Sequence, residues 1–149
     1  MSNPNIKPSS RLILLDTKDP VSQAAATVTT GWLPVADYTN FLALLAVGAL
    51  GASATVDAKL EQATSSGGAG AKDITGKSIT QLTKAGTDDN KQVMINLRQD
   101  EVDGANSFTH FRLSITVGTA ACLIAAFVFG LDARYGPGTP DTTLKEAVA

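Results

Sequence analysis

Cysteine and charge are scarce in this sequence, and each scarcity excludes a class of protein. The single cysteine, Cys122, excludes an intrachain disulfide framework. Charged residues make up 17% of the 149 residues, and the 12 Lys and Arg are scattered without a basic run. Nucleic-acid binding depends on clustered positive charge. We therefore expect no nucleic-acid partner.

Apolar runs long enough to span a membrane are also missing. The two longest candidates, Phe41–Ala52 and Thr119–Leu131, contain glycine and reach only about a dozen residues, whereas a spanning helix needs about 20. Residues 1–10 lack the apolar core of a signal peptide. We expect no membrane partner, synthesis in the cytoplasm and no export by a recognisable signal.

Residue types that commonly carry catalysis are few and isolated. The one histidine, His110, falls on the polar side of a predicted strand, and the sequence has no nucleophile-elbow motif. Cys122 lies in an apolar run without a second cysteine at CxxC spacing, so we expect a small buried side chain. We predict no catalytic, cofactor-binding or metal-binding residue, and no enzyme.

Two groups of carboxylates could be considered as acid–base pairs or calcium ligands. Asp57 and Glu61 alternate with apolar residues, which is typical of the solvated face of a strand. The cluster at 100–103 lacks the full twelve-residue pattern of a calcium loop. It predicts a charged turn, so neither group is expected to form a site.

Alternating apolar and polar residues are the clearest structural signal in the chain. The stretches 54–64, 92–98 and 110–117 alternate with a period of two, which predicts half-buried strands. The stretches 39–47 and 121–131 are apolar on both faces. We expect these two to be strands covered by a second sheet on one side and by a neighbouring subunit on the other, although periodicity alone leaves a short helix possible at 39–47.

Shorter stretches predict the remaining strands. A first strand is expected at 11–15, stopped by 16–20, and others at 22–32 and, less regularly, at 78–84. Together these give about eight strands joined by short turns, without intervening helical periods. The sequence therefore predicts an all-β fold, an antiparallel β-sandwich or jelly-roll-like single domain over residues 11–135.

Proline-containing polar segments flank the predicted domain. Residues 1–10 carry Pro4 and Pro8, and residues 136–149 begin Gly-Pro-Gly-Thr-Pro-Asp. Because proline prevents regular strand pairing, we expect an extended N-terminal arm at 1–10 and an extended C-terminal arm at 136–149. Such arms become ordered by lying on a partner, which favours a role in assembly.

Several short motifs resemble those of a known protein family. The run Val56–Thr64, a Ser/Gly-rich loop and then Ala71–Gly76 resemble a pattern in head-decoration (capsid-cement) proteins of tailed double-stranded-DNA bacteriophages. In that pattern a strand ending Q-x-[ST] leads into a glycine-rich loop and then D-I-T-G. Thr30–Val35 and Asp132–Tyr135 also match, so the resemblance spans about residues 27–135.

The resemblance implies a structural virion protein on the capsid exterior, made in the cytoplasm of the host. It would bind the major capsid protein, bridge capsomers and form a homo-oligomer, with a trimer favoured. The family has no catalytic residues to carry over. The two arms are the segments expected to touch the major capsid protein or a neighbouring copy.

Other functions stay open on the sequence alone. The first is a head–tail connector or tail-tube protein of the same virion, which would be present in about a dozen copies or fewer instead of hundreds. The second is a carbohydrate- or host-surface-binding β-sandwich module, which should expose a cluster of aromatic side chains. The third is a small hydrolase that would lose activity on His110→Ala.

Overall fold

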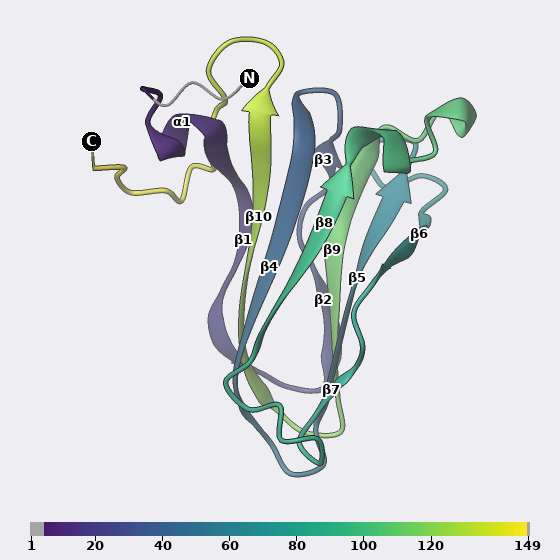
Figure 1. Cartoon of the computed structure of the whole chain (residues 1–149). Helices are drawn as coiled ribbons and strands as arrows, with labels where there is room; N and C mark the ends of the chain where they lie inside the picture. Colours follow the sequence, from purple (N-terminus) through teal and green to yellow (C-terminus); the bar gives the residue numbers. More distant parts are fainter. Residues whose placement is uncertain (1–4, 149) are drawn as a thin grey trace.

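The chain is almost entirely β structure (Figure 1). The structure is a computed structural model that describes residues 5–148; the predicted arms at 1–10 and 136–149 therefore lie partly outside the described residues, at 1–4 and 149. The elements in chain order are α1 (Pro8–Arg11), β1 (Leu12–Gln23), β2 (Ala26–Thr29), β3 (Leu33–Pro34), β4 (Tyr38–Leu50), β5 (Thr55–Ala63), β6 (Lys72–Ser78), β7 (Leu82–Thr83), β8 (Gln92–Arg98), η1 (Gln99–Glu101), η2 (Gly104–Asn106), β9 (His110–Gly118) and β10 (Cys122–Ala133).

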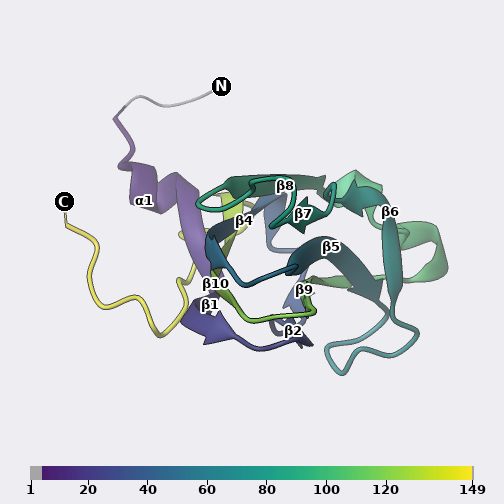
Figure 2. The same ribbon diagram turned by 90° about the horizontal axis from the view of Figure 1, so that it is seen from below.

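Two antiparallel sheets pack face to face (Figures 1 and 2). Sheet A has the strand order β1-β10-β4-β8, and sheet B has the order β2-β9-β5-β6, with β3 paired to β9 and β7 paired to β5. With the two-residue strands β3 and β7 set aside, the remaining strands follow the order 1-8-3-6 and 2-7-4-5. This is the strand order of a jelly roll. The predicted all-β sandwich is confirmed.

The alternating stretches form strands as predicted. They correspond to β5, β8 and β9, and the observed bounds of β8 match the predicted 92–98. The two stretches that are apolar on both faces form β4 and β10, which are direct neighbours in sheet A. The helix left possible at 39–47 is therefore excluded.

The first strand was predicted wrongly. Instead of a strand at 11–15 that stops at 16–20, β1 continues to Gln23, with register shifts against β10 between Leu14 and Asp16 and between Lys18 and Val21. The strand can continue through Pro20 because β1 is at the edge of its sheet, where a proline and bulges are tolerated. The strand predicted at 22–32 is divided in the structure: residues 22–23 are the end of β1, and residues 26–29 form β2.

The region between the glycine-rich loop and β8 also differs from expectation. The strand predicted at 78–84 is reduced to β7, and β6 precedes it over Lys72–Ser78. β6 is an edge strand with one buried apolar side chain, Ile74. A strand that buries so little leaves almost no alternating pattern in the sequence.

The core lies between the two sheets and joins them through aromatic contacts. The ring of Phe41 on β4 lies 4.6 Å from that of Phe111 on β9, centroid to centroid, and both side chains are fully buried. Tyr38 contacts Phe41 edge-on at 6.0 Å. Burying each such side chain contributes roughly 1.5–3 kcal/mol to the stability of the sandwich.

Both ends of the described chain lie beside the same end of sheet A (Figures 1 and 2). α1 leads directly into β1, and the chain after β10 folds back onto β1. The backbone N–H of Asp141 donates to the carbonyl oxygen of Leu14 at 2.8 Å. Gly138 packs so tightly that a Cβ there would lie 2.6 Å from the Tyr38 hydroxyl oxygen. Neither α1 nor the two 3-10 turns in the described chain is long and apolar enough to cross a membrane.

Candidate interaction surface on sheet A

The outer face of sheet A is apolar, although it does not face sheet B. Its two central rows, read across β1, β10, β4 and β8, are Leu14–Phe129–Leu42–Asn96 and Thr17–Phe127–Leu44–Met94. We call the six apolar residues of these rows, together with Ala46, Leu123 and Ala125, the apolar face; the polar Thr17 and Asn96 lie at its edges, on β1 and β8. A sheet with one solvated side usually alternates apolar and polar residues. β4 and β10 do not, which leaves their second apolar side uncovered by sheet B.

The exposure and packing of these side chains mark the apolar face as an unusual surface. Met94 on the edge strand β8 is 64% exposed, and Leu123 near the start of β10 is 47% exposed. The rings of Phe127 and Phe129 stack with centroids 6.3 Å apart. None of the residues in the two central rows carries a charge. A continuous apolar patch of this kind marks an interaction surface in soluble proteins.

Two hollows indent this side of the molecule. The arm cleft, about 430 Å³, lies between the sheet residues Leu14, Phe127 and Phe129 and the arm residues Pro140 and Leu144. The distal hollow, about 460 Å³, lies at the other end of the strands. Its lining includes the small residues Ala46, Gly48 and Ala125, with Val21 and Leu123 as larger apolar neighbours. Both hollows are predominantly apolar.

The outer face of sheet B is charged instead. The guanidinium of Arg112 donates to Glu61 Oε2 at 2.7 Å and lies 4.4 Å from the centre of the Trp32 ring. Lys59 Nζ donates to Asp73 at 2.7 Å, a hydrogen bond that raises the pKa of Lys59. Glu61 and its neighbours thus form the solvated strand face that the sequence predicted, held by ion pairs.

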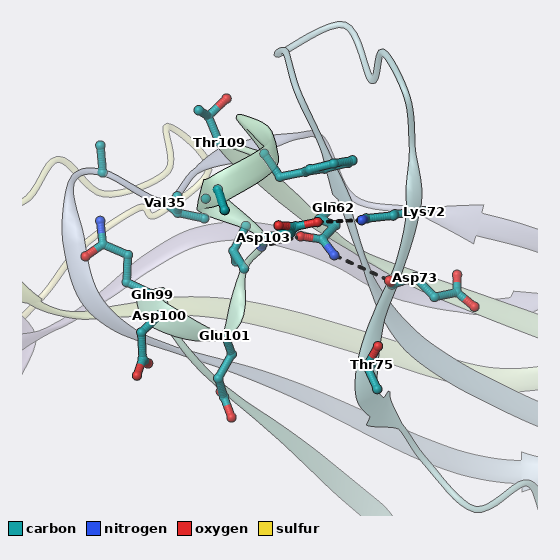
Figure 3. Close-up of a pocket in the computed structure, with 15 residues that line it drawn as sticks. Val35, Gln62, Lys72, Asp73, Thr75, Gln99, Asp100, Glu101, Asp103 and Thr109 are labelled. Atoms are coloured by element: carbon teal, nitrogen blue, oxygen red, sulfur yellow. Dashed lines mark hydrogen bonds and ion pairs between the residues drawn. The ribbon is translucent and has the colours of Figure 1, made fainter.

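A polar pocket of about 940 Å³ opens at one end of sheet B, between β5, β6 and the two 3-10 turns (Figure 3). Gln62, buried in its wall, accepts the backbone N–H of Asp103 through Oε1 at 2.8 Å. Its Nε2 donates to the Asp73 carbonyl oxygen at 3.5 Å. The side chain therefore ties the 3-10 turns to β6, which is a structural role.

The carboxylates of this pocket are paired with cations. Asp103 lies 2.7 Å from Lys72, and Glu101 lies 2.8 Å from Lys77. The hydrogen bond from Lys72 lowers the pKa of Asp103, and the backbone N–H of Arg98 lowers the pKa of Glu101. The segment 100–103 is a charged turn, as predicted, and its carboxylates stabilise the turn.

The remaining candidate residues are separated from one another. His110 lies on the outer face of β9, where Nδ1 is 2.9 Å from the Thr109 hydroxyl oxygen. Cys122 is buried, as predicted, with Sγ 3.6 Å from the carbonyl oxygen of Ala120. Within residues 5–148, no three His, Cys, Asp or Glu side chains are grouped so that they could hold a metal ion.

Sequence reasoning identified part of the apolar face and missed the rest. The two-sided apolar stretches at 39–47 and 121–131 indicated that each had a second apolar side. The structure adds that they pair with each other, so their outer sides merge into one surface. The contributions of β1 and of Met94 were missed, because neither belongs to a long apolar run.

Comparisons with known proteins show no family for this chain. No family model and no curated protein matches it. A chain in the structure of infectious bursal disease virus Gt strain is similar with a TM-score of 0.46 and 11% sequence identity, covering 91% of this chain and 36% of that chain. This chain spans about a third of the length of that viral chain. A TM-score below 0.5 is too low to support a conclusion about function.

The class of the protein is therefore defined by its own topology. It is a two-sheet jelly roll, an architecture used by viral capsid proteins, lectins and cupins. Because one fold serves many functions, the function has to be inferred from the surface.

Proposed function

We propose that this chain is a structural virion protein that binds the outer surface of a tailed-phage capsid and stabilises the shell by bridging capsomers. The observation that carries the proposal is the apolar face of sheet A. A protein that works alone gains nothing from exposing Met94 and Leu123 beside stacked phenylalanines. A protein that assembles gains the free energy of burying them.

The position of the arms supports an assembly role. The described parts of both arms lie at one end of sheet A, so arms and apolar face together offer one extended surface (Figure 2). In the proposed arrangement this side contacts the major capsid protein or a neighbouring copy in a homo-oligomer, with a trimer favoured. The charged outer face of sheet B contacts solvent. Many such weak contacts acting together give high avidity on a shell.

The carbohydrate-binding alternative gains little from the structure. Among the described residues, Tyr135 is the one aromatic side chain that is mostly exposed, and the stacked rings of Phe127 and Phe129 are only partly exposed. Sugar- and base-stacking surfaces usually present several aromatic rings together. The connector alternative uses the same kind of surface and differs in copy number.

The proposal is tested on particles and on purified protein. Mass spectrometry of purified particles should give hundreds of copies per particle, and about a dozen would identify a connector. Capsids lacking the protein should bind the full chain, and Met94→Glu with Leu123→Glu should weaken that binding at least about tenfold, a loss of about 1.4 kcal/mol.

The control places a carboxylate on the outer face of sheet B instead, with Thr27→Glu on the edge strand β2. Thr27 is exposed, and its hydroxyl oxygen lies 2.9 Å from that of Thr116. We expect capsid binding within about twofold of the unmodified protein, because surface substitutions of this kind change little. Absence of the protein from particles would overturn the proposal.

A further inference from the structure

The C-terminal arm carries apolar side chains that its own body covers only in part. After the hydrogen bond of Asp141 to β1, the arm continues over residues 142–148. Leu144 is 39% exposed and Val148 is 86% exposed. In Figures 1 and 2 the chain beyond Asp141 leads outward from the body, while Leu144 and Ala147 still line the arm cleft. An extended segment with uncovered apolar side chains gains order and burial by lying on another surface.

The distal hollow is an apolar recess that could receive such side chains. It lies on the same side of the molecule as the arm but at the opposite end of β10. Ala46 and Ala125 leave space at its floor, and no charged residue lines it. The space above Gly48 is already taken by Leu123, whose Cβ would lie 3.0 Å from a Cβ at Gly48. Small residues on a sheet face open room for side chains that come from elsewhere.

A second copy of this chain supplies a segment that fits. The arm offers two branched apolar side chains four residues apart, and beyond Asp141 it contains neither proline nor glycine. Its one lysine and one glutamate, Lys145 and Glu146, are adjacent and cancel in charge. The arm therefore brings no net side-chain charge to the apolar hollow when it lies across it.

We propose that the C-terminal arm of one copy, Thr142–Val148, lies on the apolar face of a second copy and seats Leu144 and Val148 in its distal hollow. The arm and the hollow are different surfaces, so the contact is heterologous. Repeated heterologous contacts close into rings when the rotation between copies permits. This contact deepens the proposed function, since it rests on the homo-oligomer proposed above, but it forms without a capsid.

Complementation between two full-length variants tests this contact. The arm variant is Leu144→Asp with Val148→Asp, and the hollow variant is Ala46→Gln with Ala125→Gln, both on the outer side of sheet A. Light scattering coupled to size-exclusion chromatography should find the unmodified chain oligomeric at about 100 μM. Each variant alone should be monomeric. An equimolar mixture should form a one-to-one heterodimer, because it contains one intact arm facing one intact hollow.

Control variants distinguish loss of the proposed contact from a general effect of substitution or from misfolding. Thr142→Asp adds a charge to the arm without touching its apolar side chains, and Leu144→Ile keeps apolar character; both should remain oligomeric. If thermal melting shows that the hollow variant does not fold, Val21→Asp replaces it, since Val21 is exposed on an edge strand.

Three results would overturn the proposed contact: an unmodified chain that is monomeric at about 100 μM, an arm variant that assembles like the unmodified chain, or a mixture that stays monomeric. Any of these with capsid binding retained would leave the virion function standing and remove only the arm contact. Complementation without capsid binding would leave the arm contact standing and remove the virion function.

Discussion

Sheet A and sheet B bury similar side chains between them but present different chemistry to the outside. Facing inward, both contribute aliphatic residues and one central phenylalanine. Facing outward, sheet A presents leucine, phenylalanine and methionine, whereas sheet B presents ion pairs such as Arg112–Glu61 and Lys59–Asp73. Burial between the sheets requires apolar residues on the inner side of each strand. The residues on the outer side depend on whether that sheet contacts solvent or a partner.

The largest expected effect on stability concerns the inner faces, where the two sheets are alike. Phe41→Ala in sheet A and Phe111→Ala in sheet B should each lower the free energy of unfolding by about 3–5 kcal/mol, because each leaves a cavity at the shared ring contact. Urea denaturation measures both. A loss below about 1 kcal/mol for either would mean that the core is not packed as described.

A smaller effect is expected on the charged face. Glu61→Gln removes the carboxylate that accepts from Arg112 in a partly buried pair, so it should cost about 1 kcal/mol of stability. Raising the salt concentration should shrink the difference between the two proteins. A double-mutant cycle with Arg112→Met isolates the pair, and a coupling energy near zero would contradict the assigned role.

Acid should weaken the turn end of sheet B. The pKa values of Asp103 and Glu101 are lowered in the folded chain, by Lys72 and by the Arg98 backbone N–H respectively. Their stabilisation is therefore present above the ordinary carboxyl pKa values of 3.8 and 4.5 and is lost as the pH falls through the folded values. Amide exchange at η1 and η2 should speed up below about pH 4 before exchange in β10 does. Leu50 at the end of β4 should respond as well, because Asp89, which accepts its backbone N–H, also has a lowered pKa. Simultaneous acceleration would contradict this.

The smallest effect on stability is expected on the apolar face itself. Met94→Gln should change the free energy of unfolding by less than about 0.5 kcal/mol, because the side chain is mostly exposed. The same substitution should reduce self-association in light scattering. A large loss of stability with unchanged association would show that Met94 serves the fold and not a partner.

Local sequence pattern predicted the strands that have one solvated and one buried side. The alternation around Ile95 and around Leu113 reports a solvated face directly, and β8 and β9 followed it. β1 was misjudged because Asp16 and Pro20 look like stops, although an edge strand can pass both with bulges. β6 left almost no pattern, since Ile74 is its one buried side chain.

The apolar face could be predicted only in part because it depends on pairing between distant segments. Leu44 and Phe127 are neighbours only because β4 pairs with β10. Nothing local in either stretch identifies that partner, since many registers satisfy the same apolar runs. The hollow at Gly48 likewise exists only once Leu123 and Ala125 lie beside it.

The most direct test of the account is a density map of purified particles with this protein resolved on the shell. We expect the outer face of sheet A, with Phe127 and Phe129, to be covered by the major capsid protein or by a neighbouring copy, and the Arg112–Glu61 face to contact solvent. A map with sheet A bare and sheet B against the shell would contradict it.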